Sequence, residues 1–407
     1  MLKSIDTGEL KLGMAIHDLD CGWMAHPFVR GRFVIRAHAE IDMIRKAGIR
    51  SVVIDCERGL DVAHAAALEV TVASAETEMQ KIAEVPQRGG PERSGLDDEL
   101  GRAIRVKQHA LEVVRTVMKD IRLGRAIALQ DVEAVVQSIT NSVLRNQAAL
   151  FGLLRIKNKD DYTFLHSVSV CTLLVAFCRS LEMDARIITQ AGIGGLLHDT
   201  GKALVPDEIL NKPGKLTDDE FAIVKRHPRD GYEILRQSPD VSDIVLDITL
   251  HHHERRDGTG YPEKQAETEI SELAQMAAIV DVYDALTSDR CYHKGLCAAE
   301  ALRKIYQWSK HHFNPVLVQQ FMRCVGIYPV GTLVRLESGR LGIVVEPHAT
   351  NLLTPKVNVF FNTKANTHVR PTIVDLSRPL GFGGGDRIVS YEKPENWKIN
   401  VDPFMHA

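Results

Sequence analysis

The stretch Gly195-Leu196-Leu197-His198-Asp199-Thr200-Gly201-Lys202 places an imidazole beside a carboxylate directly after a run of apolar residues. Ile193, Leu196 and Leu197 have the spacing of a buried helix face, and Gly201 is suited to end the helix because glycine readily adopts the left-handed conformation. A buried, unpaired charge at such a helix end is costly. Two interpretations therefore stand side by side: a solvated His-Asp pair at a helix end, or a pair of metal ligands.

The composition limits the class of protein. A chain of 407 residues is longer than a single ordinary core requires, so we expect two or three domains. The 50 basic and 53 acidic residues nearly balance, so we expect no DNA partner. Seven cysteines without a CxxC pair are typical of a reducing compartment. The first residues turn polar at once, and no apolar run approaches the roughly 18 residues of a membrane span, so we expect a cytoplasmic protein.

Changes of pattern divide the chain into segments. Short β-branched runs with one helical run at 40–48 open the chain, a polar, glycine- and proline-containing stretch follows, helical periodicity then dominates, and strand-like runs return near the end. The fold class is therefore mainly α: a central all-α bundle, a small N-terminal α/β domain and a short C-terminal β appendage. The predicted boundaries are 1–70 for the N-terminal domain, 71–100 for a linker, 101–328 for the helical domain and 329–407 for the β extension.

Side chains able to bind a metal recur through the helical segment at intervals of 25 to 32 residues: His166, His198-Asp199, His227, His252-His253 and Asp281. Each interval is about one helical hairpin, so successive helices can bring these groups to one level of a bundle. Imidazole with carboxylate suits first-row divalent metals. The set exceeds the needs of one ion, and two ions about 3.5–4 Å apart would support hydrolysis of a phosphate ester. Considered singly, each histidine has a structural alternative; His227, for example, could fill or cap a helix.

The same residues lie in motifs that resemble the HD phosphohydrolase superfamily and its HD-GYP subfamily. His198-Asp199 matches the HD pair, and His252 to Pro262 (HHERRDGTGYP) closely resembles the HHExxDGxGYP motif. Further matching segments follow in the family's order at 162–167, 206–210, 216–217, 227–231 and 281–290. Residues 1–70 resemble the uncharacterised domain that precedes many bacterial HD-GYP domains, and the C-terminal β segment resembles their usual tail.

This resemblance implies an HD-type bundle that acts as a cyclic di-GMP phosphodiesterase, opening the ring to pGpG and often continuing to GMP. It implies that the metal ligands are the seven residues His166, His198, Asp199, His227, His252, His253 and Asp281, with Asp199 as the bridge between two ions. Iron, manganese and nickel are not distinguished, because their preferences for nitrogen and oxygen overlap.

Four further residues are candidates for contacts with the substrate. Lys202 follows the helix end, where its ammonium could reach a phosphate; the alternative is a solvated lysine favoured by the helix dipole. Gly260 and Tyr261 lie in a glycine-rich loop that can approach a ligand closely, and Tyr261 could stack on guanine or only pack. Arg290 suits bidentate phosphate binding, with a surface ion pair as its alternative. We expect Asp199 and Lys202 to contribute to catalysis.

Two departures from the family pattern qualify these expectations. Tyr162 stands where some members have a glutamate associated with a third metal, so we expect two ions rather than three. His293 and Lys294 follow Arg290 where the family often has one basic residue, which would change phosphate affinity or its pH dependence. The other histidines of interest are treated as structural: His17, His38, His64, His251, His311 and His312.

Two rival functions remain open from the sequence. One is an HD phosphohydrolase that acts on another cyclic dinucleotide or nucleotide. The other is a sensor or adaptor that binds cyclic di-GMP with little turnover and signals to a partner protein through the N-terminal domain. The oligomeric state is also open, with a homodimer among the alternatives.

Overall fold

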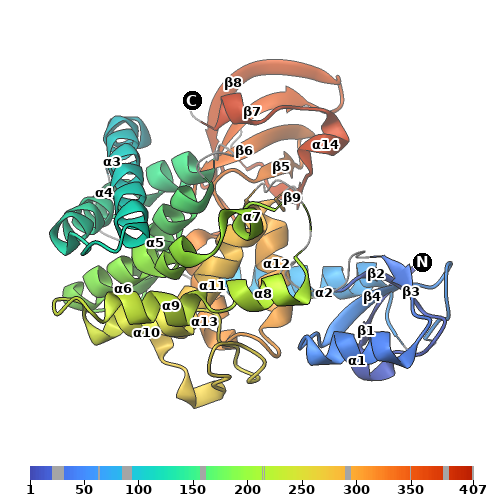
Figure 1. Cartoon of the computed structure of the whole chain (residues 1–407). Helices are drawn as coiled ribbons and strands as arrows, with labels where there is room; N and C mark the ends of the chain where they lie inside the picture. Colours follow the sequence, from blue (N-terminus) through green and yellow to red (C-terminus); the bar gives the residue numbers. More distant parts are fainter. Residues whose placement is uncertain are drawn as a thin grey trace.

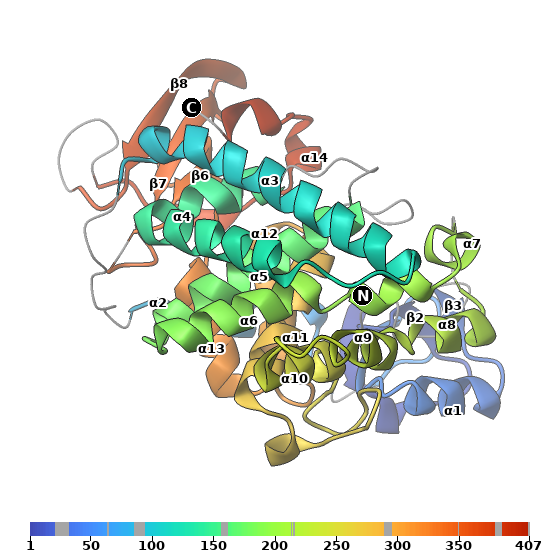
Figure 2. The same ribbon diagram turned by 60° about the vertical axis from the view of Figure 1, so that its left-hand side comes forward.

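The computed structural model describes residues 1–20, 32–62, 65–84, 94–155, 162–212, 214, 216–288, 295–348, 350–378 and 385–405. A central helical domain carries a small N-terminal α/β domain on one side and a C-terminal β domain on another (Figure 1). Two long helices, α3 (Leu96–Arg122) and α4 (Leu129–Arg155), cross one face of the helical domain and contact each other along their lengths (Figure 2). This arrangement agrees with the predicted fold class.

The N-terminal domain is a four-stranded antiparallel sheet with the strand order β1-β4-β2-β3. Helix α1 buries Ile41 and Ile44 against β-branched residues of this sheet, which gives the domain its own core. Strand β1 was not predicted, and the run expected at 10–16 contributes only the first two residues of β2. The elements are β1 (Leu2–Asp6), β2 (Ala15–Asp18), β3 (Phe33–Val34), α1 (His38–Lys46) and β4 (Ser51–Asp55).

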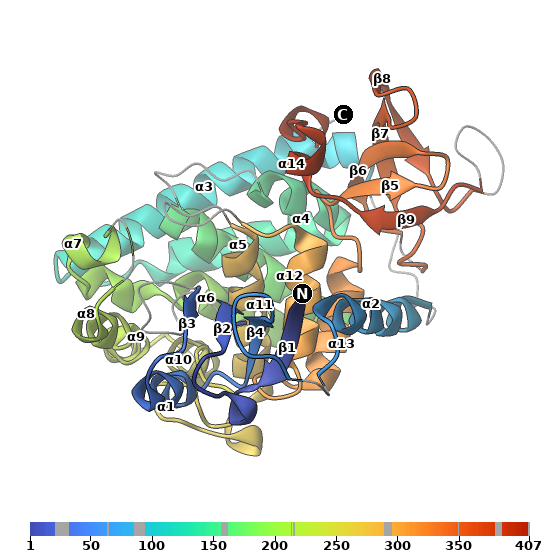
Figure 3. The ribbon, with the colours of Figure 1, turned by 90° about the vertical axis from the view of Figure 1, so that its right-hand side faces the viewer.

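Helix α2 (Leu68–Glu84) lies in the segment for which the sequence predicted a linker. Its Ala75, Met79 and Ala83 are buried, and the helix packs on α12 and α13 of the helical domain (Figure 3). This apolar face is hard to recognise in the sequence, because it is a narrow stripe surrounded by small and charged residues. The remaining predicted linker includes residues 85–93, which lie outside the described residues, and the start of α3.

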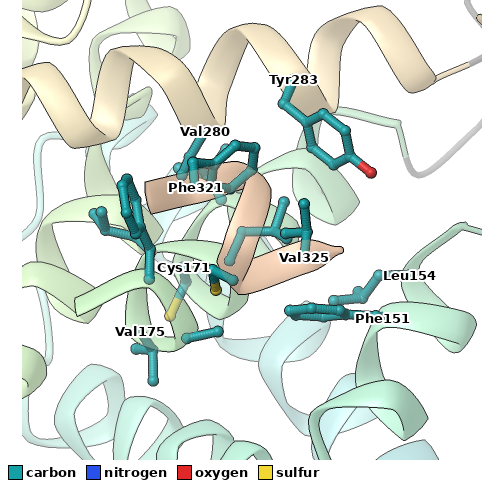
Figure 4. Packing of buried hydrophobic residues seen from close by; sticks show 14 of the residues in the cluster. Phe151, Leu154, Cys171, Val175, Val280, Tyr283, Phe321 and Val325 are labelled. Carbon is teal, nitrogen blue, oxygen red and sulfur yellow. The ribbon is translucent and has the colours of Figure 1, made fainter. Parts of the chain in front are cut away.

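The helical domain surrounds α5, whose residues from Leu165 to Cys178 are almost all buried. Within the described chain α5 is the one helix long and apolar enough to cross a membrane by composition, yet 78% of its apolar window is buried inside the protein. Figure 4 shows Cys171 and Val175 of α5 packed beside Val280 of α11 and Phe321 of α13. The principal helices after α4 are α5 (Tyr162–Ser180), α6 (Ala185–Leu197), α8 (Asp218–Val224), α9 (His227–Leu235), α10 (Asp243–His251), α11 (Glu272–Thr287), α12 (Ala298–Trp308) and α13 (Pro315–Val325).

The C-terminal domain is an antiparallel sheet with the strand order β8-β7-β6-β5-β9. Three of its strands match the predicted runs, whereas β8 and β9 were missed because their side chains do not alternate clearly between buried and exposed. The strands are β5 (Leu333–Leu336), β6 (Arg340–Glu346), β7 (Lys356–Asn362), β8 (Thr367–Asp375) and β9 (Ile388–Tyr391).

Candidate metal centre

The donors predicted from the sequence come from five helices that meet inside the bundle. His166 lies on α5, and Asp281 lies on α11, which packs against it. His198 and Asp199 directly follow α6, His227 begins α9, and the pair His252-His253 follows α10. Because three of these helices end or begin at a donor, their termini define the level of the bundle at which the donors meet. All seven side chains are buried, or nearly so.

Six of the seven donors form two groups of three. Within each group the ligand atoms lie within 4.8 Å of one another. One group is His166, His198 and Asp199, and the other is His227, His252 and His253. The first group combines two imidazoles with a carboxylate and the second offers three imidazoles, and both donor types suit first-row divalent ions. The described residues therefore contain two adjacent sets able to hold a cation.

Asp199, a member of the first group, also contacts the second. Its Oδ2 is 3.3 Å from His198 Nε2 and 3.6 Å from His166 Nε2, and its Oδ1 is 3.2 Å from His227 Nε2. Asp281 has a similar position, with Oδ1 2.9 Å from His166 Nε2 and Oδ2 3.7 Å from His253 Nδ1. Each carboxylate thus directs one oxygen toward histidines of the first group and the other oxygen toward a histidine of the second.

Backbone carbonyls fix the orientation of three imidazoles. The Nδ1 atoms of His198, His227 and His252 lie 2.8, 2.7 and 2.9 Å from the carbonyl oxygens of Gly195, Val224 and Thr249, respectively. If each Nδ1 carries the hydrogen, each Nε2 presents its lone pair to the centre of the site. This outer hydrogen bond is the usual device for selecting the tautomer of a metal-binding histidine.

Asp284 orients the fourth imidazole, a role that was not predicted from the sequence. Its Oδ2 is 2.6 Å from His166 Nδ1, on the side of the ring away from Asp281. Burial lowers the pKa of His166, but the two carboxylates outweigh burial and raise it. The available signal was its spacing: Asp284 is three residues after Asp281 and so lies on the same face of α11.

Several buried polar atoms in the site lack a partner, which supports a bound cation. His198 Nε2 and His253 Nε2 have no hydrogen-bond partner among the described residues, and Asp199 Oδ1 makes no well-aligned hydrogen bond. Leaving such atoms unpaired is unfavourable. Burial also lowers the pKa values of His227, His252 and His253, which keeps these imidazoles in the neutral form that metals bind.

The two aspartates have the complementary property. Burial disfavours ionisation of Asp199 and Asp281, but nearby histidines, together with Lys202 for Asp199, outweigh burial and hold both pKa values well below the ordinary range. Lys202 Nζ donates a hydrogen bond of 2.6 Å to Asp199 Oδ2, and its side chain is 14% exposed. Its ammonium therefore lies at the metal centre and not in solvent.

The glycine-rich loop packs over the second histidine group. The ring centroid of Tyr261 lies 4.7 Å from that of His253, with the rings inclined by 33°. Gly260 lies so close to the preceding turn that a Cβ atom there would be 2.4 Å from the Arg255 nitrogen, so no larger residue fits. Oε1 of Glu254 accepts hydrogen bonds from the backbone of Glu263 and Lys264, which fixes the far end of the loop.

A cavity of about 440 Å³ leads to the site. His252, His253 and Asp281 line it, as do Tyr261 and also His312, which the sequence analysis treated as structural. His251 has the structural contacts expected of it, with Nδ1 2.7 Å from Asp247 Oδ1 and Nε2 3.2 Å from Glu263 Oε2. The predictions for Arg290, His293, Lys294 and the Tyr162 side chain fall outside the described residues.

Comparison with known proteins places this chain in a family. The HD domain family matches residues 146–317, and a domain of unknown function, DUF3391, matches residues 2–132. The cyclic di-GMP phosphodiesterase PA4108 of Pseudomonas aeruginosa is 45% identical over 404 residues, which cover 99% of this chain and 95% of that protein. The chain belongs to the HD domain family. The similarity of this HD-domain protein to PA4108 therefore extends over the N-terminal and C-terminal domains as well as the helical domain.

Other similar proteins match smaller parts of the chain. RpfG of Xanthomonas campestris, a cyclic di-GMP phosphodiesterase response regulator, is 38% identical to this HD-domain protein over 204 residues, covering 49% of this chain and 53% of RpfG. Among solved structures, Bd1817, an HDG"Y"P protein from Bdellovibrio bacteriovorus, has a TM-score of 0.47 and 18% identity, covering 79% of this chain and 98% of that one.

Proposed function

We propose that this HD-domain protein hydrolyses cyclic di-GMP to pGpG, with GMP as a further product, at a centre holding two divalent transition-metal ions. The observation that carries the proposal is the pair of adjacent buried donor groups, with Asp199 contacting histidines of both. Full-length similarity to a curated cyclic di-GMP phosphodiesterase supports the choice of substrate. Iron, manganese and nickel all suit the donor set.

In this proposal His166 and His198 hold one ion, His227, His252 and His253 hold the other, and Asp199 and Asp281 contribute to both. When bound, such a pair of ions neutralises charge on the phosphoryl group and lowers the pKa of water. Lys202 adds a positive charge beside Asp199, where negative charge develops during phosphodiester cleavage. Tyr261 provides an aromatic face at the wall of the cavity for a base, and Arg290 is proposed to bind phosphate.

The test is turnover by the purified full-length protein loaded anaerobically with Mn²⁺ or Fe²⁺, with products separated by chromatography. The proposal expects pGpG to form first and GMP to follow. Parallel reactions with cyclic di-AMP and with the mixed guanine-adenine cyclic dinucleotide test the rival phosphohydrolase function. Faster turnover of either of those substrates would replace cyclic di-GMP as the substrate.

The rival sensor function gives a different result in the same experiment. A sensor would retain intact cyclic di-GMP after the metal is added, and binding would persist without product. Metal analysis of the same sample distinguishes the two-ion centre from a single ion, since the proposal expects about two equivalents per chain.

A further inference from the structure

The cavity above the metal centre has a wall from a different domain. Met43, Lys46 and Ala47, at the end of α1 in the N-terminal domain, line it together with Phe221 and Lys225 from the region of α8. Trp308 and Phe313 of the helical domain also line the cavity. A substrate held in this cavity would therefore touch both domains.

The N-terminal domain docks on the glycine-rich loop that carries Tyr261. Arg50 Nε is 3.3 Å from Asp257 Oδ2, while Asp257 Oδ1 accepts a hydrogen bond of 2.6 Å from the Thr259 hydroxyl. Gly48 has a positive φ of 71° and lies so close to Thr259 that a Cβ atom would be 2.8 Å from the Thr259 Cβ. One carboxylate thus ties the loop to itself and to the domain that bears Lys46.

A second contact holds the docked domain at another point. Lys304 Nζ on α12 is 3.2 Å from Asp20 Oδ1 and 3.5 Å from Asp18 Oδ2, and its side chain is 17% exposed. The two attachments, one before and one after α1 in the chain, restrict rotation of the N-terminal domain about either one. The end of α1 is therefore held at the cavity and is not merely near it.

The chemistry of this wall fits the part of a cyclic dinucleotide that lies away from the metal centre. Such a substrate has two phosphodiesters, and only one can be at the centre between Asp199 and Asp281. Lys46 is exposed and has no acidic partner among the described residues, and Lys225 lies over the Phe221 ring at 4.7 Å. Met43 is 39% exposed, which leaves its flexible thioether available to a base.

We infer that the N-terminal domain completes the substrate pocket: Lys46 pairs with the phosphodiester that is not cleaved, and Met43 packs against a guanine base. This inference rests on the proposed function, because it assigns contacts to the same cyclic dinucleotide. It gives the N-terminal domain a direct part in substrate binding. Lys46 and Met43 are binding residues, because the inference gives them contacts with the substrate away from the phosphodiester that is cleaved.

The experiment compares steady-state kinetics of full-length Lys46→Ala, Lys46→Arg and Lys11→Ala with cyclic di-GMP and Mn²⁺. Lys11 is an exposed lysine of the same domain that does not line the cavity, so it controls for net charge. We expect Lys46→Ala to raise KM about fivefold to tenfold, a larger change than in kcat, because a charged hydrogen bond to phosphate is lost. Lys46→Arg should restore most of the affinity. The KM difference should shrink at high salt, as expected for an exposed charge pair.

The outcomes separate the inference from the proposed function. If the wild-type protein does not turn over cyclic di-GMP, the proposed function fails and the inference fails with it. If the wild type is active but Lys46→Ala has the same KM as Lys11→Ala, only the inference is overturned. Thermal unfolding of each variant shows whether a KM change comes from loss of the folded domain. A KM change in Lys46→Ala that neither high salt reduces nor Lys46→Arg reverses also overturns the inference.

Discussion

Two clusters of buried charged side chains in the helical domain differ in how well their polar atoms are hydrogen-bonded. Between α3 and α4, both carboxylate oxygens of Glu99 are bonded: Oε1 to Ser142 and Arg145, and Oε2 to Arg145 at 2.6 Å. At the candidate metal centre, His198 Nε2 and His253 Nε2 make no hydrogen bond among the described residues. Both carboxylate oxygens of Glu99 are satisfied within the protein, whereas the second cluster has donor atoms available to a ligand.

The difference separates structural from functional burial of charge. Glu99 is fully buried, yet its pKa is lowered, because Arg145 and Ser142 outweigh the effect of burial. The donors at the metal centre instead face one another across a shared space, where an added cation would satisfy several of them at once.

The largest effect is expected for Asp199→Ala. Because each Asp199 oxygen faces a different donor group, its loss weakens both cation positions, and we expect cyclic di-GMP turnover to fall more than about 1000-fold. The measurement is pGpG release by the full-length variant. Asp240→Ala, which removes an exposed carboxylate of the same domain, is the control and should retain wild-type turnover. Unchanged turnover in Asp199→Ala would exclude the two-metal mechanism.

Removal of the metal should abolish activity and lower stability. A ligand present at 100 times its dissociation constant stabilises the folded state by about 2.7 kcal/mol, so Mn²⁺ added to the chelated protein should raise the melting temperature. Mg²⁺ should restore less activity than Mn²⁺, because imidazole nitrogen suits later first-row ions better. A melting temperature independent of Mn²⁺ would argue against cation binding at the unpaired donors.

Asp284→Asn tests the support around the centre. The substitution keeps the shape of the side chain but weakens its hold on His166 Nδ1, so we expect Mn²⁺ affinity to fall about 10- to 100-fold. The apparent Mn²⁺ affinity is read from activity against free metal. Asp247→Asn is the matched control, since Asp247 makes an equivalent 2.7 Å contact with His251, a histidine outside both donor groups. An equal loss of Mn²⁺ affinity in the two variants would contradict a role of Asp284 in orienting His166 for metal binding.

The sequence predicted the convergence of the seven donors better than the surroundings of the site. Their spacing was informative because each donor follows the previous one by about one helical hairpin, and the structure brings them together. Asp284 was missed because a carboxylate one turn after Asp281 could equally face solvent.

The contribution of the N-terminal domain depends on docking between residues far apart in the chain, such as Arg50 and Asp257, and no local pattern encodes that contact. Helix α2 was taken for part of a linker for a similar reason: burial of its small apolar face depends on α12 and α13.

Glu99→Gln should affect stability and leave catalysis unchanged. Arg145 would lose its buried partner, but its side chain is 34% exposed and stays partly hydrated, so we expect a loss of about 2 kcal/mol. Because the folded-state pKa of Glu99 is lowered, its contribution is present above the unfolded pKa of about 4.3 and is lost as the pH falls through the folded value. Urea unfolding at pH 7 and pH 4 should therefore show a smaller difference between variant and wild type at pH 4. A fall in kcat with unchanged stability would contradict a structural role.

The smallest effect is expected at the contact between domains. Arg50 is 48% exposed and Asp257 11% exposed, so their ion pair is partly screened and is worth about 0.5 kcal/mol. We therefore expect Arg50→Ala to raise the KM for cyclic di-GMP about twofold, through a looser position of α1, with little change in melting temperature. Arg58→Ala, at a residue 78% exposed and paired with Asp55 inside the N-terminal domain, should leave KM unchanged. Because exposed pairs respond to salt, the Arg50→Ala effect should disappear at high ionic strength, whereas the effect of Asp199→Ala should persist.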